Sequence, residues 1–164
     1  QQLRVVGNLP YNISTPLIFH LLSYAGQIED MHFMLQKEVV DRMVAQPSTS
    51  DYGRLSVMLQ YRFEMERILI VPPESFNPQP KVESAIVRMF PLQQPIAKTD
   101  DEALFARVVA TAFSQRRKTL RNTLRKYLGQ EDFTTLEIDS GLRAENLTIA
   151  QYISIANHIA AKTL

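Results

Sequence analysis

The sequence predicts an α/β fold in which a sheet ends in an antiparallel pair of strands and is followed by a small all-α domain. Three observations support this prediction. Apolar runs typical of buried strands alternate with stretches of helical periodicity over residues 1–60. Two β-rich runs then follow one another across a proline-rich connection, as in an antiparallel pair. Beyond residue 98 the apolar residues recur at helical spacing.

A strand, a loop and a helix come first. Residues 3–6 form a short apolar run, and we expect a buried strand there. Ser14 or Thr15 can cap the following helix, and Pro16 suits its first turn. The apolar face of this helix lies within residues 17–22.

The order of strand and helix then repeats. Residues 31–35 have the pattern of a buried strand, and apolar residues recur at helical spacing over residues 39–44. Residues 54–63 fit either a period of two or a helix, and we favour the helix. Two further strands are expected at residues 68–71 and 84–90. The prolines between them exclude a helix or a central strand, so we expect a rigid, irregular loop.

The last part of the chain is expected to be helical. Thr99 and Glu102 have the spacing of a capping box before the first of these helices. A second helix should end near Gly129 in a left-handed cap, and the last should begin at Thr148 with Gln151 completing a second capping box. The second helix is expected to bury Leu120, Leu124 and Leu128. The last is expected to bury Ile149, Tyr152, Ile153, Ala156 and Ile159.

Composition restricts the class of protein. A chain of 164 residues that is 45% hydrophobic can bury the core of one domain with a small appendage. Cysteine is absent, which excludes disulfides, thiolate nucleophiles and cysteine-type zinc sites, and the net charge of +1 gives no global argument for nucleic-acid binding. The three histidines are scattered, so we expect no metal site. No apolar run approaches the roughly 20 residues that span a bilayer, and we expect a cytoplasmic protein.

The turn after the first strand is the candidate catalytic site. Asn8, Leu9, Pro10 and Tyr11 follow the carboxyl end of a strand, where ligands bind in open α/β sheets. These residue types suit methyl transfer to the exocyclic amino group of adenine. The Asn8 side-chain oxygen and a backbone carbonyl of Leu9 or Pro10 could accept hydrogen bonds from the amino group, and Tyr11 offers a face for the base. The alternative is a plain strand-to-helix turn in which asparagine caps and proline rigidifies.

Six stretches of the sequence closely resemble the bacterial small-subunit (16S) rRNA adenine dimethyltransferases, the family linked to kasugamycin sensitivity. They are residues 7–17, 34–40, 52–57, 76–85, 113–122 and 143–147. The resemblance covers the whole chain. It implies the C-terminal half of a class I (Rossmann-like) methyltransferase sheet, followed by a helical RNA-binding domain. The expected division is a methyltransferase part at residues 1–91, a linker at residues 92–98 and the helical domain at residues 99–164.

The resemblance also implies an activity and roles for particular residues. The family transfers methyl groups from S-adenosylmethionine to two adjacent adenosines near the 3′ end of small-subunit rRNA, two on each. The residue matching Asn8 contacts both the cofactor and the target nitrogen, and the one matching Tyr11 stacks on the adenine. Phe76, in the irregular loop, is expected to stack on the other face of the flipped base. Alternatively, Phe76 anchors the loop against the sheet edge.

A short segment of the helical domain is strongly basic. The residues expected to bind RNA are Arg116, Arg117, Lys118, Arg121 and Arg125. On one continuous helix Arg117, Arg121 and Arg125 would share a face and form a cationic ridge. The alternative is a solvated helix face that is partly neutralised by acidic residues within 131–145.

The glycine-rich loop and the acidic residue that class I methyltransferases use to hold the cofactor are not found in the sequence. We therefore expect this chain to correspond to the part from the fourth strand onward, to bind S-adenosylmethionine weakly and to be inactive alone. The full-length parent is expected to be a monomer that acts on the immature 30S subunit, whereas this fragment can self-associate through an exposed sheet edge. Two other functions stay open, a large-subunit rRNA adenine methyltransferase of the macrolide-resistance type and a non-catalytic RNA-binding or ribosome assembly factor.

Overall fold

The computed structural model describes residues 2–163, and within them the chain divides into two compact units. The first contains the residues up to 45 together with 62–94 and holds the sheet. The second contains 46–61 together with the residues from 95 onward and is helical. No helix within the described residues has the length and apolarity needed to cross a membrane.

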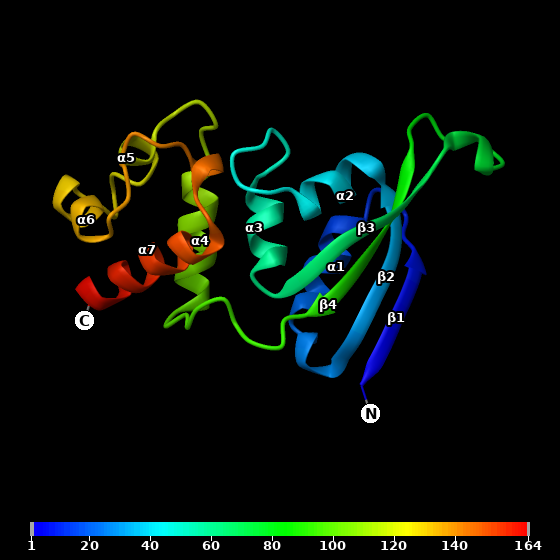
Figure 1. Cartoon of the computed structure of the whole chain (residues 1–164), viewed down its shortest axis with the longest axis horizontal. Coiled ribbons are helices and arrows are strands. Elements are labelled where there is room, and N and C mark those ends of the chain that lie inside the picture. Colours follow the sequence, from blue (N-terminus) through cyan, green and yellow to red (C-terminus); the bar gives the residue numbers. More distant parts are fainter. Residues whose placement is uncertain (1, 164) are drawn as a thin grey trace. The chain divides into compact units, whose positions relative to one another are not determined.

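The first unit is built on a sheet of four strands (Figure 1). They are β1 (Leu3–Asn8), β2 (Ile28–Gln36), β3 (Phe63–Val71) and β4 (Ser84–Pro91), and their order is β1-β2-β4-β3. The β1 and β2 strands are parallel, whereas β4 is antiparallel to both β2 and β3. The α/β sheet ending in an antiparallel pair, predicted from the sequence, is confirmed.

Two helices accompany this sheet, α1 (Ser14–Leu22) and α2 (Lys37–Val44). The core side chains come from the inner strands and from one face of each helix, as the period-two and helical patterns require. The fully buried ones include Ile18, Met31, Phe33, Leu35, Val40, Met43, Val87 and Met89. The buried strand predicted at residues 31–35 and the helix predicted over 39–44 are therefore both present.

The prediction of burial for the first strand is wrong. Leu3 and Val6 on β1 are 59% and 77% exposed. The physical reason is position, because β1 is an edge strand of the described sheet and pairs there only with β2. A strand of a parallel sheet is buried only when helices and strands cover it on all sides.

The capping predicted for the first helix is also wrong. Ile13 occupies the cap position and gives no side-chain hydrogen bond to the helix. Ser14 is already helical, and its hydroxyl donates to the Tyr11 carbonyl at 3.2 Å instead. The serine therefore holds the preceding turn rather than the helix end.

Most of the ambiguous segment forms the helix that we favoured, α3 (Arg54–Gln60), but Phe63 already belongs to β3, which begins before the predicted residue 68. Residues 46–61 group with the helical unit, although the sequence placed them in the methyltransferase part. The reason is Tyr52, which is 3% exposed and donates its hydroxyl to the Leu147 carbonyl at 2.8 Å. Its ring lies edge-on to Phe113, with centroids 6.3 Å apart.

The helical unit centres on α4 (Glu102–Ala112) and α7 (Ile149–Lys162). The last helix begins as predicted, because the Thr148 hydroxyl accepts from the Gln151 amide at 3.2 Å and all five predicted side chains are buried. The capping box expected at Thr99 and Glu102 does not form. Asp101 lies directly before α4, and its carboxylate accepts from the Leu104 amide at 2.9 Å.

The middle of this unit departs most from the prediction. The expected second helix is only α5 (Leu120–Thr123), although Leu120, Leu124 and Leu128 are buried as predicted. Gly129 adopts no left-handed cap, and it precedes α6 (Gln130–Thr135) with its amide donating to Asp132 at 2.8 Å. Short 3₁₀ turns complete the described elements at Ala25–Gln27, Pro73–Ser75 and Ala144–Asn146.

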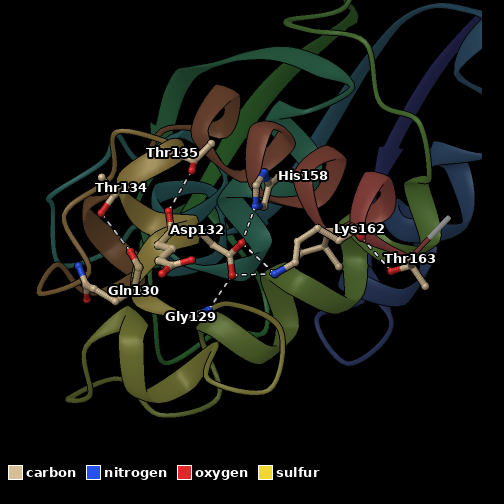
Figure 2. A network of polar contacts seen from close by, with 10 residues as sticks. Gly129, Gln130, Asp132, Thr134, Thr135, His158, Lys162 and Thr163 are labelled. Carbon is tan, nitrogen blue, oxygen red and sulfur yellow. Dashed lines mark hydrogen bonds and ion pairs between the residues drawn. The ribbon is translucent and has the colours of Figure 1, made fainter.

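Figure 2 shows how the carboxylate of Asp132 joins α6 to α7. His158 lies 2.8 Å from one carboxylate oxygen, and the Lys162 ammonium donates to both oxygens at 2.8 Å. The hydrogen bonds from His158, from Lys162 and from the Gly129 amide hold the pKa of Asp132 well below its usual range. This carboxylate therefore connects three segments of the helical unit.

Candidate active site

The turn after β1 is held by backbone hydrogen bonds at both ends. Asn8 ends the strand opposite Met34, and the Leu9 amide donates to the Met34 carbonyl at 3.2 Å. The Ile13 amide donates to the Pro10 carbonyl at 3.2 Å, which closes the turn before α1. Together these contacts fix the backbone between the strand and the helix.

Gly7 provides the space into which the Leu9 side chain folds. A Cβ atom at Gly7 would lie 3.2 Å from Leu9 Cδ2 and 3.7 Å from the Phe33 ring. Leu9 itself is only 8% exposed. The buried side chain of Leu9 therefore anchors the turn.

Tyr11 is fixed at both of its ends. Its hydroxyl lies 2.6 Å from the hydroxyl of Ser84, the first residue of β4, and its carbonyl accepts from the Ser14 hydroxyl. Ser84 is fully buried, whereas Tyr11 keeps 37% of its surface exposed. The ring is thus anchored to the sheet by its hydroxyl while part of its surface stays open to a ligand.

Phe76 comes from the irregular loop between β3 and β4, directly after the 3₁₀ turn Pro73–Ser75. Its amide donates to the Pro73 carbonyl at 3.1 Å. Residues from this loop and from the β1 turn line one cavity of about 320 Å³: Asn8, Leu9, Pro10, Tyr11, Phe76, Pro78 and Pro80. The structure therefore brings together all five residues that the sequence proposed for catalysis and base stacking.

Two hydrogen-bond acceptors at this cavity are unused among the described residues. The exposed side chain of Asn8 makes no hydrogen bond within residues 2–163. No described donor reaches the Leu9 carbonyl, whereas the Pro10 carbonyl already accepts from Ile13. Of the two carbonyls that the sequence left open, Leu9 is thus the one available to a ligand.

The basic segment does not form the predicted ridge. Because α5 contains only four residues, Arg117 and Arg125 lie outside it and share no helix face with Arg121. Arg116 donates to the Ser50 carbonyl at 2.6 Å and lies 4.0 Å from the Glu145 carboxylate. Among the described residues, this is the one ion pair between the predicted cations and the acidic residues of 131–145. The remaining four cations are exposed.

Sequence reasoning missed the contacts that Ser84 and Ser14 make with Tyr11. Both are buried serines whose hydroxyls contact Tyr11. Ser84 could have been found, because a serine at the start of an apolar β-run must satisfy its hydroxyl inside the fold. Within residues 2–163 the structure shows no group of three or more His, Asp and Glu side chains that could hold a metal ion.

The four-stranded sheet, with its parallel β1–β2 pair and a cavity at the carboxyl end of β1, is a mixed α/β sheet like the C-terminal half of a Rossmann-like methyltransferase sheet, as its similarity to solved methyltransferases shows. The fold matches a dimethyladenosine transferase from Plasmodium falciparum with a TM-score of 0.86 at 24% identity, covering 100% of this chain and 69% of that one. It also matches the 23S rRNA methyltransferase ErmE with a TM-score of 0.71 at 23% identity, covering 98% and 66%.

Sequence comparison then identifies the family. The model of the ribosomal RNA adenine dimethylase family matches residues 1–161, and the chain belongs to this family. Ribosomal RNA small subunit methyltransferase A of Nitrosospira multiformis is 68% identical over 158 residues, which are 96% of this chain. The protein of the same name from Aromatoleum aromaticum is 66% identical over 161 residues, or 98% of this chain. The chain spans about 61% of the length of these two relatives.

Proposed function

We propose that this chain is part of an S-adenosylmethionine-dependent rRNA adenine dimethyltransferase. The whole protein transfers methyl groups to the exocyclic amino groups of two adjacent adenosines near the 3′ end of small-subunit rRNA, during ribosome biogenesis in the cytoplasm. The observation that carries the proposal is the single cavity that collects Asn8, Leu9, Tyr11 and Phe76. Membership of the family and the names of the relatives support the class of substrate.

The two unused acceptors explain how an unreactive amino group becomes a nucleophile. The lone pair of the adenine amino nitrogen is delocalised into the ring. When its two N–H groups donate to the Asn8 side-chain oxygen and the Leu9 carbonyl, the nitrogen becomes more pyramidal and its lone pair can point at a methyl donor. Fixed acceptors of this kind lower a barrier by positioning and by electrostatic preorganisation. Pro10 stiffens the turn that carries them.

The aromatic residues hold the base in place. Tyr11 and Phe76 line the same cavity from different segments. In the proposed complex an adenine lies between them and stacks on both rings. Stacking on an aromatic side chain contributes roughly 1–3 kcal/mol per base. That energy offsets the unstacking that is needed to take a base out of an RNA strand.

Within this chain, Asn8 is the residue that fits the cofactor. S-adenosylmethionine, when bound, would supply the methyl group for the amino nitrogen, and Asn8 would hold its methionine end. The exposed Asn8 amide has no partner among the described residues and can contact the methionine end of the cofactor as well as the base. We place the rest of the cofactor site in the part of the whole protein that lies outside this chain, which spans 61% of the length of a relative. We therefore expect these 164 residues to bind the cofactor weakly and to be inactive alone.

The exposed edge of β1 agrees with the proposal that this chain is part of a longer protein. In the whole protein the exposed edge at Leu3 and Val6 pairs with further strands, and the whole protein is a monomer that binds the immature 30S subunit. In this chain alone the same edge favours self-association. The basic segment of the helical unit supplies contacts to RNA phosphates through Arg116, Arg117, Lys118, Arg121 and Arg125.

Methyl mapping tests the proposal. The chain, joined to the N-terminal segment that its relatives carry, is incubated with labelled S-adenosylmethionine and immature small subunits, and the modified nucleotides are mapped. We expect label on two adjacent adenosines, and we expect Tyr11→Ala to lower kcat/KM by roughly 10- to 100-fold, the equivalent of one lost stacking contact. Tyr24→Ala is the matched control, because Tyr24 is 43% exposed in the same unit and does not line the cavity. Unchanged methylation by Tyr11→Ala contradicts the stacking role.

A further inference from the structure

The helical unit contains a cavity between the start of α4 and the end of α7. Its volume is about 550 Å³, compared with about 320 Å³ for the cavity at the β1 turn, and it falls within the roughly 300–1,000 Å³ range of small-molecule sites. The proposed methyl transfer uses none of its lining residues. They are Asp100, Asp101, Leu104, Arg107, Tyr127, Ile159, Ala160 and Thr163.

Half of this lining is apolar or aromatic. Leu104 and Ile159 are nearly buried, at 7% and 6% exposed, so the area that they keep is small and enclosed. Ala160 contributes only a methyl group, which leaves room for a ligand, and Tyr127 contributes a half-buried ring. Such a surface favours a ligand with an apolar body, because binding removes apolar area from water.

The charged side chains of the lining are available to a ligand. Within residues 2–163, the Asp100 carboxylate and the Arg107 guanidinium have no hydrogen-bond or ion-pair partner. Asp101 uses one carboxylate oxygen to cap α4 and keeps the other. Two carboxylates and one guanidinium leave the lining with an excess of negative charge. The cavity therefore attracts a cation and repels the phosphates of RNA.

The opposite charges of the lining are separated along α4. Asp101 directly precedes the helix and Arg107 lies six residues further on, which places their Cα atoms roughly 9 Å apart. An ammonium group can therefore approach Asp100 and Asp101 without contacting Arg107. The Lys126 ammonium, 4.7 Å from the centroid of the Tyr127 ring, also excludes a second cation from that ring. A flat ring suits the arginine and tyrosine planes, so the lining matches an aromatic ring that carries an aliphatic amine.

Contacts outside the cavity fix the segments that form it. The Asn157 side chain accepts from the Asp100 amide at 3.0 Å and donates to the Lys98 carbonyl at 2.8 Å, which ties the segment before α4 to α7. The Tyr127 amide donates to the carbonyl of the fully buried Leu124 at 2.8 Å. A site that is already formed loses less entropy when its ligand binds.

We propose that this cavity binds a small aromatic amine, whose ammonium group pairs with Asp100 and Asp101 while its ring lies on the apolar part of the lining. The site is independent of the proposed function, because it needs neither RNA nor S-adenosylmethionine. A ligand held between α4 and α7 also stabilises the helical unit, since it binds the folded chain only.

Two indole compounds test the class of ligand. Tryptamine and indole-3-propionate share a ring and a side-chain length, but the first carries an ammonium group and the second a carboxylate. The chain contains no tryptophan, so indole fluorescence reports the ligand alone. We expect the fluorescence anisotropy of tryptamine to rise on titration with this chain, with an affinity at least tenfold above that of indole-3-propionate. Absence of tryptamine binding, or equal binding of the two compounds, overturns the proposal.

Variants locate the binding. Ala160→Phe fills the cavity, whereas Ala161→Phe adds the same ring at the exposed neighbouring position that does not line it. We expect the first to lower tryptamine affinity at least tenfold and the second to leave it unchanged. Asp100→Asn, at an exposed position that is safe for folding, should lower the affinity by roughly three- to fivefold, the effect of one exposed ion pair, and the exposed Asp51→Asn should not. Affinity that is insensitive to both Ala160→Phe and Asp100→Asn refutes the site.

Competition separates this site from the proposed function. We expect single-stranded RNA, added to the chain with tryptamine bound, to leave the anisotropy of tryptamine unchanged. If RNA displaces tryptamine, the cavity belongs to the RNA-binding surface and the proposal fails while the proposed function stands. If the chain binds tryptamine but no RNA, the proposal stands and the RNA-binding role of this chain fails.

Discussion

The hydrogen bond between Tyr11 and Ser84 gives the sharpest prediction about the site. The two hydroxyls lie 2.6 Å apart, and Ser84 is fully buried while Tyr11 is 37% exposed. Removing either hydroxyl deletes the same bond but leaves a different partner behind. After Ser84→Ala, the tyrosine hydroxyl can turn to water. After Tyr11→Phe, the serine hydroxyl stays buried without a partner.

The two substitutions should therefore lower the free energy of unfolding by unequal amounts. Loss of a typical hydrogen bond costs about 1 kcal/mol, whereas an orphaned buried polar group costs about 1–3 kcal/mol. We expect Ser84→Ala to lower the free energy of unfolding by about 1 kcal/mol and Tyr11→Phe by about 2 kcal/mol. The double variant removes the orphan together with the bond, so it should be less destabilised than the sum of the single variants by about 1 kcal/mol or more.

Urea denaturation of the four proteins measures this coupling, and methylation by the whole protein measures its effect on function. Because the phenol is held by Ser84, Ser84→Ala should lower kcat/KM and leave the affinity for RNA nearly unchanged. Threonine at position 84, which keeps a hydroxyl, should restore part of the loss. Additive single and double variants, within about 0.3 kcal/mol, refute the claim that Ser84 positions Tyr11.

Two further predictions concern the turn and the helical unit. Gly7→Ala places a Cβ 3.2 Å from Leu9 Cδ2. We expect it to lower the free energy of unfolding by about 1 kcal/mol and to lower methylation, because it displaces the Leu9 carbonyl. Gly26→Ala is the control, since its added Cβ would have nothing within 4 Å, and it should change neither quantity. The depressed pKa of Asp132 stabilises the fold above the unfolded pKa of about 3.9, and this stabilisation is lost as the pH falls toward the folded value. Asp132→Asn should therefore lower the Tm at pH 6. The difference in Tm between this variant and the parent should become smaller between pH 4 and pH 2, as measured by calorimetry. A Tm difference that is independent of pH, or one matched by the exposed Asp51→Asn, contradicts this assignment.

The elements that the sequence predicted correctly are those whose patterns are strong and local. The last helix combines a capping box at Thr148 with a regular apolar face, and both are present. The antiparallel pair followed from two β-rich runs on either side of prolines, which leave few other arrangements. The meeting of Tyr11 and Phe76 at one cavity was expected from the resemblance to the family.

Other features depend on long-range contacts that no local pattern contains. The leucines at 120, 124 and 128 are buried as a helix would bury them, yet the chain is helical only over Leu120–Thr123. The helix does not begin earlier because the Leu120 and Arg121 amides bond across to the carbonyls of Leu142 and Ser140. The ridge of arginines was lost with that helix. The prediction that β1 is buried failed for a similar reason, because the exposure of a strand depends on the elements beside it and not on its own residues.

The central claim is that the Asn8 side chain and the Leu9 carbonyl hold the amino group of an adenine that lies between Tyr11 and Phe76. The most direct measurement is a structure of the whole protein with its target adenosine in the cavity. The claim predicts an amino nitrogen about 2.7–3.2 Å from both the Asn8 side-chain oxygen and the Leu9 carbonyl oxygen. An amino group bound by the Pro10 carbonyl, or a base that stacks on neither ring, contradicts it.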